Sequence, residues 1–283
     1  MKHADFAGSW YPGTAGACEE KIREFMDGYE VSESVALAGV VPHAGWIFSG
    51  KLACRAMAQL AAGAEQGVDT VVVFGGHLRP ESTSFLLGRT GVETPLGEIP
   101  VDEELGVELT QNVPAPGIHA LEPNRFPQEN TLELQYPFIK YFFPKAMILP
   151  VGIAPGLAEL AGEAVVSAAE KLGRKIRVVG STDMTHYGPR FGMSNRGNGP
   201  TALYWVTREN DAAGLEAMAS MEPERIMAEG LKSRNMCCPG AVGATAAAAK
   251  KMGAAKGICL DYATSYSDDD PSHFVGYGAI LYI

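Results

Sequence analysis

Short, almost wholly apolar segments recur along the chain and predict buried strands at residues 36–41, 70–74, 146–151 and 176–179. Such segments are typical of strands that are covered on both faces of a sheet. Longer segments carry apolar residues at helical spacing and predict helices at residues 18–29, 51–62, 103–111, 157–172 and 201–219. An alanine-rich segment at 242–252 predicts a further helix, and residues 273–283 predict a closing strand.

The alternation of strands and helices predicts an α/β fold, with a central, mostly buried β-sheet flanked by helices on both faces. Residues 91–100 and 188–200 bring Gly and Pro close together and predict surface loops. The sequence has no linker rich in Pro, Gly and Ser and no internal repeat. We therefore expect a single domain over residues 1–283.

Composition and charge argue against several classes of protein. The formal net charge is −10, and no block of Lys and Arg exceeds a short cluster, so a nucleic-acid-binding surface is not expected. Five scattered cysteines do not indicate a disulfide framework. The first residues lack the apolar core of a signal peptide, and no apolar run approaches the ~18 residues of a membrane span. We expect a cytoplasmic protein that does not enter a membrane.

Three of the six histidines stand directly after predicted strands. His43 follows the first strand, His77 follows a pair of glycines after the second, and His186 lies three residues beyond Asp183. Loops at the carboxyl ends of parallel strands converge, and neutral imidazole is the commonest metal ligand. For any one of these histidines taken alone, a hydrogen-bonded turn residue is the preferred interpretation. Their equivalent positions favour a shared site.

A pair of cysteines, Cys237 and Cys238, precedes the alanine-rich helix. The positive end of the helix dipole favours a thiolate, the form that binds metal or attacks an electrophile. From these residues alone, a buried, inert cysteine is the preferred interpretation. Asp183 is either an acid–base partner of His186 or a turn-capping residue. Glu133 lies in an apolar stretch, where its carboxylate needs a cation or a histidine as partner unless it lies on a solvated helix face.

Motifs for nucleotide binding, serine hydrolysis and zinc-protease chemistry are absent from the sequence. Other segments, however, are similar to a known family. The sequences AGSWYP at 7–12 and VPHAGWIFSG at 41–50 resemble the opening segments of the Memo family. Further matches follow in order at 94–102, 133–137, 181–186 and 276–277. The resemblance therefore covers nearly the whole chain.

This resemblance implies a fold similar to that of the class III extradiol dioxygenases and a metal-binding cleft. The ligands of the family's better-known members, two histidines and a cysteine, fall on His43, His77 and Cys237. Asp183 and His186 would line the same cleft.

The sequence departs from the family pattern at two positions. Cys238 stands in place of a glycine and could compete with Cys237 for the metal. Asn130 stands in place of a histidine, which puts an acid–base role for that position in doubt.

Two imidazoles and a thiolate suit iron(II), our first choice, or zinc or copper. Three protein ligands leave a coordination position open. Our first hypothesis is a dioxygenase-like oxidoreductase acting on a planar small molecule, with His186 as acid–base residue oriented by Asp183. The resemblance also implies AMMECR-type and radical SAM protein partners. The alternatives are a non-catalytic adaptor that binds a metal or a peptide in the same cleft, and zinc-dependent hydrolysis.

Overall fold

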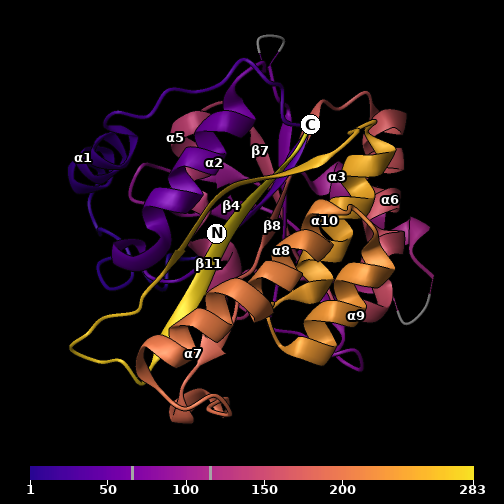
Figure 1. Cartoon of the computed structure of the whole chain (residues 1–283). Helices are drawn as coiled ribbons and strands as arrows, with labels where there is room; N and C mark the ends of the chain where they lie inside the picture. The colour runs from indigo at the N-terminus through magenta and orange to yellow at the C-terminus, as the bar shows by residue number, and fades with distance from the viewer. Residues whose placement is uncertain (65–66, 115–116) are drawn as a thin grey trace.

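The computed structural model describes residues 1–64, 67–114 and 117–283. These residues form a nine-stranded mixed sheet with helices packed around it (Figure 1). Its strand order is β10-β11-β1-β8-β2-β7-β3-β6, and β9 pairs with β11. The strands are β1 (Ala38–Val41), β2 (Thr70–Gly75), β3 (Ser84–Leu87), β6 (Ile118–Leu121), β7 (Met147–Gly152), β8 (Ile176–Ser181), β9 (His186–Tyr187), β10 (Gly257–Thr264) and β11 (Phe274–Tyr282). A separate hairpin joins β4 (Gly91–Val92) to β5 (Ile99–Pro100).

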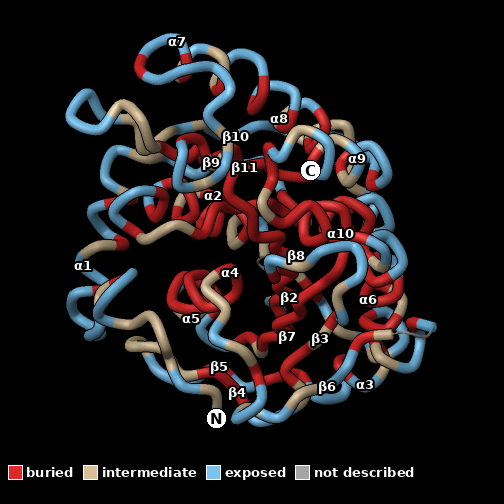
Figure 2. The backbone as a smooth tube through the Cα atoms, turned by 90° about the horizontal axis from the view of Figure 1, so that it is seen from below, coloured by how far each residue is buried: buried red, intermediate tan, exposed pale blue. Residues whose placement is uncertain are grey.

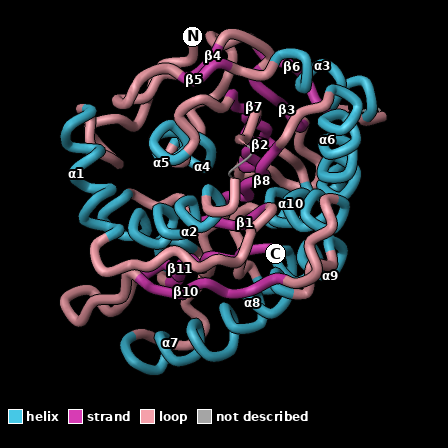
Figure 3. Tube along the Cα trace, turned by 90° about the horizontal axis from the view of Figure 1, so that it is seen from above, coloured by secondary structure: helices cyan, strands magenta, loops and turns pink. Residues whose placement is uncertain are grey.

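Helices cover both faces of this sheet (Figure 3). The α-helices are α1 (Ala15–Met26), α2 (Lys51–Ala61), α3 (Glu103–Asn112), α4 (Asn130–Glu133), α5 (Tyr136–Phe142), α6 (Ala158–Leu172), α7 (Gly199–Trp205), α8 (Asp211–Ala219), α9 (Pro223–Ser233) and α10 (Pro239–Lys251). Short π or 3₁₀ turns occur at η1 (Trp46–Gly50), η2 (Pro155–Leu157), η3 (Pro189–Phe191) and η4 (Val206–Asn210). Helices α1, α2, α4 and α5 lie on one side of the sheet, and α3, α6, α9 and α10 on the other.

Side chains of the central strands alternate between two hydrophobic cores. In β2, Val72 and Phe74 pack into the core under α6 and α10, whereas Val71 and Val73 pack into the core under α2 and α5. This alternation explains why the strands are apolar throughout, since neither face meets water. Figure 2 shows the central strands as almost continuously buried. The expected α/β sheet with helices on both faces is confirmed.

Helix α10 lies between the sheet, α6 and α9. Its residues 239–249 are all buried, which explains the run of alanines, because larger side chains would not fit. The backbone of α6 approaches it closely at Gly162, where an added Cβ would lie 2.1 Å from the Ala244 carbonyl oxygen. This packing fixes the amino-terminal end of α10, directly after Cys237 and Cys238.

Several elements differ from those the sequence predicts. The helix expected at 201–219 is divided by the π turn η4 into α7 and α8. This turn coincides with buried Asn210 and Asp211, which both form hydrogen bonds to Thr185. The sequence does not predict strands β3, β6, β9 and β10 or helices α4, α5 and α9. The loop expected at 91–100 contains the β4–β5 hairpin. Among the described residues, no helix has the length and apolar character that crossing a membrane requires.

Substitution of Gly162 by alanine should destabilise the protein by about 1–3 kcal/mol, because the new methyl group overpacks the α6–α10 contact. Gly16 in α1 has no heavy atom within 4 Å of an added Cβ, so Gly16→Ala should be neutral or slightly stabilising. Urea unfolding of both variants measures the difference. Equal unfolding midpoints for the two variants would contradict the packing described for α10.

Candidate metal centre

The carboxyl ends of β1, β8 and β2 lie side by side. These three strands pair in parallel, with Val41 opposite Ser181 and Phe74 opposite Gly180. Each strand leads into a loop that carries a polar side chain, and the loops therefore meet at one edge of the sheet. The structure brings His43, His77 and Cys237 together at this edge, with Cys238 as a fourth member.

His43 follows β1 and is only 1% exposed. Its backbone N–H donates to Asp183 Oδ1 over 2.8 Å, and its ring Nδ1 lies 3.0 Å from Ser181 Oγ. These contacts orient the ring so that Nε2 lies 3.2 Å from the sulfur of Cys237. The imidazole is therefore held with one nitrogen toward the protein and the other toward the centre of the cluster.

His77 follows a turn in which Gly76 has a φ of +93°. The Gly76 N–H donates to Thr131 Oγ1 over 2.7 Å, which fixes the turn. The His77 ring lies at 84° to that of His43, with 5.1 Å between the ring centroids. Its Nδ1 lies 3.6 Å from Glu129 Oε1. Burial disfavours the His77 imidazolium, but the Cys237 sulfur and the Glu129 carboxylate outweigh this effect and raise its pKa to about 10.

Cys237 is tied to Asp183 by two hydrogen bonds. The Cys237 N–H donates to the Asp183 carbonyl oxygen over 3.0 Å, and the Asp183 N–H donates to the Cys237 sulfur over 3.2 Å. Burial alone would raise the pKa of the Cys237 thiol, but the Cys238 thiol and the neighbouring histidines lower it well below its usual range. A thiolate beside two imidazoles is a suitable ligand set for a divalent metal ion.

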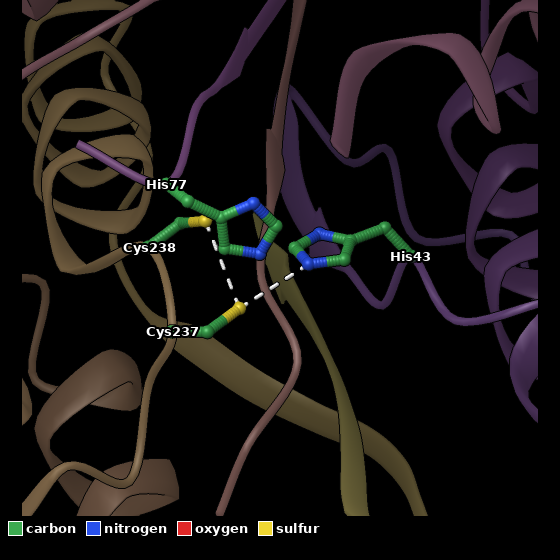
Figure 4. A group of neighbouring side chains, drawn as sticks. All are labelled: His43, His77, Cys237 and Cys238. Atoms are coloured by element: carbon green, nitrogen blue, oxygen red, sulfur yellow. Dashed lines mark hydrogen bonds between the residues drawn. The ribbon is translucent and has the colours of Figure 1, made fainter. Parts of the chain in front are cut away.

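Cys238 is the N-cap of α10 and is 1% exposed. Its N–H donates to Thr182 Oγ1, and its sulfur lies 3.6 Å from that of Cys237. One ligand atom from each of His43, His77, Cys237 and Cys238 lies within 4.8 Å of the others, and the four side chains point toward one another (Figure 4). Two sulfurs at about 2.3 Å from one zinc ion would be about 3.8 Å apart in a tetrahedron, so the observed spacing fits a common ion.

Asp183 and His186 lie beside this cluster. Asp183 is 4% exposed, and its Oδ2 lies 3.7 Å from His186 Nε2 and 3.9 Å from His43 Nε2. His186 Nε2 is buried and has no hydrogen-bond partner among the described residues. Burial disfavours the His186 imidazolium, yet the Asp183 carboxylate and the Cys237 sulfur raise its pKa to about 9. The loop after β8 thus places both expected acid–base residues next to the candidate ligands.

A buried carboxylate supports this loop from behind. Asp211 Oδ1 accepts hydrogen bonds from the N–H and the hydroxyl of Thr185, and Oδ2 accepts one from Tyr262 over 2.7 Å. Burial raises the pKa of Asp211 to about 6. Because Thr185 stands between Asp183 and His186, this network sets the course of the loop that carries both. No local pattern in the sequence marks Asp211, which lies within a predicted helix.

Glu133 has a role that the sequence did not reveal. Its carboxylate accepts hydrogen bonds from the N–H groups of Asp5 and Phe6 and from the hydroxyl of Tyr11. It therefore anchors the amino-terminal segment and is neither solvated nor a partner of a histidine at the cluster. The carboxylate beside His77 is instead Glu129, which the sequence analysis missed.

Asn130 also lies close to the cluster. Its side-chain N–H donates to the His43 carbonyl oxygen over 3.3 Å. This contact supports the backbone of a candidate ligand, whereas an amide cannot exchange a proton as the histidine of the family pattern could.

Two cavities of about 460 Å³ each adjoin the cluster and share His77 and His186. The first, which we call the apolar cavity, is lined by His43, Asp183 and, among others, Trp10, Ile47, Phe48 and Tyr277. The second, which we call the arginine cavity, is lined by Cys237 and, among others, Arg79, Arg234, Met184, Met193 and Met236. Both volumes are within the usual range of small-molecule sites, about 300–1,000 Å³.

The chain is similar to known proteins over nearly its whole length. A family model described as Memo-like protein matches residues 2–281. A MEMO1 family protein of Thermococcus onnurineus is 31% identical and covers 100% of this chain and 99% of its own length. One of Methanosarcina barkeri is 30% identical, with 99% of each chain covered. The solved structure of the uncharacterized protein JW3007 of Escherichia coli is similar in fold, with a TM-score of 0.54, 11% identity, and 87% of this chain and 99% of that chain covered.

The raised pKa of Asp211 predicts a specific dependence of stability on pH. Folding makes ionisation of this carboxyl less favourable, so the free energy of unfolding should fall as the pH rises from 3.8 through about 6. Asp211→Asn cannot ionise and should lack this contribution, whereas exposed Asp27→Asn should keep it. Urea unfolding at a series of pH values measures the three slopes. Identical slopes for the parent and Asp211→Asn would contradict the assignment.

Proposed function

The chain belongs to the Memo family, and we propose that it is a metal-dependent, dioxygenase-like oxidoreductase whose mononuclear ion is held by His43, His77 and Cys237. The observation that carries this proposal is the convergence of two imidazoles and a sulfur, far apart in the sequence, around one point. Iron(II) is our first choice of metal, and zinc and copper are the alternatives.

When bound, iron(II) would supply open coordination positions and the redox chemistry that oxygen activation needs. The protein's own groups would orient the ligands and handle protons. Ser181 and Asp183 hold His43 from its ring and backbone nitrogens, and Glu129 lies behind His77. Such partners behind the ligands fix ring orientation and increase metal affinity.

The apolar cavity is the site we assign to the substrate. Trp10, Ile47 and Phe48 are 41%, 80% and 57% exposed, so the walls of this cavity present accessible apolar surface. Aromatic and aliphatic walls around a few polar groups favour a planar, largely apolar small molecule. His186 lines this cavity, where its imidazole could give a proton to the substrate or take one from it, and Asp183, 3.7 Å from its Nε2, orients the ring.

Cys238 supports a second candidate function. If its sulfur binds the same ion, the site has four protein ligands and no open position, as in structural zinc sites. The protein would then be a non-catalytic adaptor that binds a metal or a peptide. Zinc-dependent hydrolysis is the third hypothesis and requires zinc with an open position. The AMMECR-type and radical SAM partners and the cytoplasmic location stay predictions from the sequence.

Metal content tests the ligand assignment. Elemental analysis of protein purified without air should find one iron per chain in the parent and little in His43→Ala and Cys237→Ser, because each variant removes a ligand. Cys259→Ser is the matched control, since this exposed cysteine of β10 lies outside the cluster, and it should retain the parent content.

Cys238→Ser separates the two candidate functions. If it keeps iron, Cys238 is not a required ligand and the open site is supported. If it loses metal as Cys237→Ser does, the closed site is supported. A parent that binds no metal when purified or when loaded would overturn the ligand assignment, and zinc in the parent would favour hydrolysis or the adaptor.

Oxygen uptake tests the reaction. The iron-loaded parent should consume oxygen with at least one of a panel of catechols, and His186→Gln should lower the rate by about 10²–10⁴-fold without losing metal, because it removes the proton-transferring group. His3→Gln is the control, since this histidine is 81% exposed and contacts Glu93 instead. No uptake with any catechol would count against the oxidoreductase and favour the adaptor. A pull-down from cell extract that compares the parent with Cys237→Ala would then test the adaptor.

A further inference from the structure

The arginine cavity differs in charge from the protein around it. The chain has a formal net charge of −10, yet the lining of this cavity includes Arg79 and Arg234 and no aspartate or glutamate. Two guanidinium groups on a concave surface attract ligands of negative charge. The amino-terminal end of α10, at Pro239, also contributes to the wall and adds the positive end of a helix dipole.

Both arginines are available to a ligand. Within the described residues, neither Arg79 nor Arg234 lies within 4.0 Å of a carboxylate, whereas Arg89, Arg174 and Arg225 each form an ion pair. The Arg234 guanidinium donates to the carbonyl oxygens of Phe191 and Gly192 over 3.1 Å each, which holds it at the cavity wall. A guanidinium has five N–H donors, so most of those of Arg234 are left for a ligand.

The backbone at Arg234 supports a function for this side chain. Arg234 ends α9 with a φ of +52°, a left-handed conformation that helix ends usually give to glycine. An arginine here has a conformational cost that a glycine would avoid. Its side chain instead reaches the loop at Phe191 and Gly192 and lines the cavity.

The remaining walls define the rest of the ligand. Met184, Met193 and Met236 contribute flexible thioethers, and Phe191 contributes an aromatic ring. Thioether and aromatic walls favour an apolar body, while the guanidinium fork matches a planar carboxylate or a phosphate. We propose that the arginine cavity is a binding site for a small organic anion, an apolar body bearing a carboxylate or phosphate group, held by Arg79 and Arg234.

This site is distinct from the apolar cavity assigned to the substrate, and binding there requires no metal ion. The test therefore uses metal-free protein, so that no probe can bind to an ion. The probes are benzoate, its neutral analogue benzamide, and phenyl phosphate, titrated by isothermal calorimetry. The parent should bind benzoate or phenyl phosphate saturably and benzamide at least about tenfold more weakly, because only the anions form charge-assisted hydrogen bonds. The tighter of the two anions identifies the preferred group.

Variants then locate the site. Arg79→Gln removes one guanidinium from an exposed side chain, and Arg234→Lys keeps the charge but loses the planar fork; each should weaken anion binding by about tenfold or more. Arg23→Gln in α1 is the matched control for net charge, because α1 packs on the other side of the sheet and does not line this cavity (Figure 3). It should bind as the parent does.

Three outcomes would overturn the anion site: no saturable binding of either anion by the parent, benzamide binding as tightly as benzoate, or Arg79→Gln behaving as Arg23→Gln does.

His43→Ala separates this proposal from the metal centre. His43 lines the apolar cavity and not the arginine cavity, so this variant should lose metal and keep anion binding. A failure of the metal assignment would leave the benzoate result unchanged, and a failure of the anion site would leave the metal content unchanged.

Discussion

Asp183 connects the separate segments that form the candidate centre. Its carboxylate accepts from the backbone of His43, its N–H donates to the sulfur of Cys237, and its carbonyl oxygen accepts from the Cys237 backbone. One residue thus links the loop after β1 to the approach to α10, segments nearly two hundred residues apart in sequence. These three hydrogen bonds fix the distance between His43 and the Cys237 thiol.

The rest of the fold keeps this linkage in place. Parallel pairing brings the ends of β1, β8 and β2 to one edge, and the buried helix α10 presents its cysteines to the same edge. Behind the loop that carries Asp183, Asp211 receives both polar groups of Thr185. Asp183, Thr185 and Asp211 are buried, and their hydrogen bonds within the protein make this part of the arrangement rigid.

The sequence predicts those parts of the architecture whose residue pattern is typical of one kind of element. Apolar strands with two covered faces, amphipathic helices and strand-end histidines are all local signals, and they predict converging loops at His43, His77 and His186. Cys237 joins this set only through the resemblance to the Memo family. What the sequence does not show depends on tertiary contacts. The π turn at η4, the edge strand β10 and the helix α9 have weak local patterns, and the partners Glu129 and Asp211 are recognisable only once distant segments meet. For the same reason, Glu133 could not be assigned to the amino-terminal segment in advance.

His77 and His186 belong to the walls of both cavities. An occupant that shifts either ring in one cavity therefore reshapes the other, and the two occupants would influence each other's affinity. Thermodynamic linkage makes that influence mutual: whatever factor the first ligand imposes on the second, the second imposes on the first. If both proposed ligands bind, this shared imidazole wall would couple them without any domain movement.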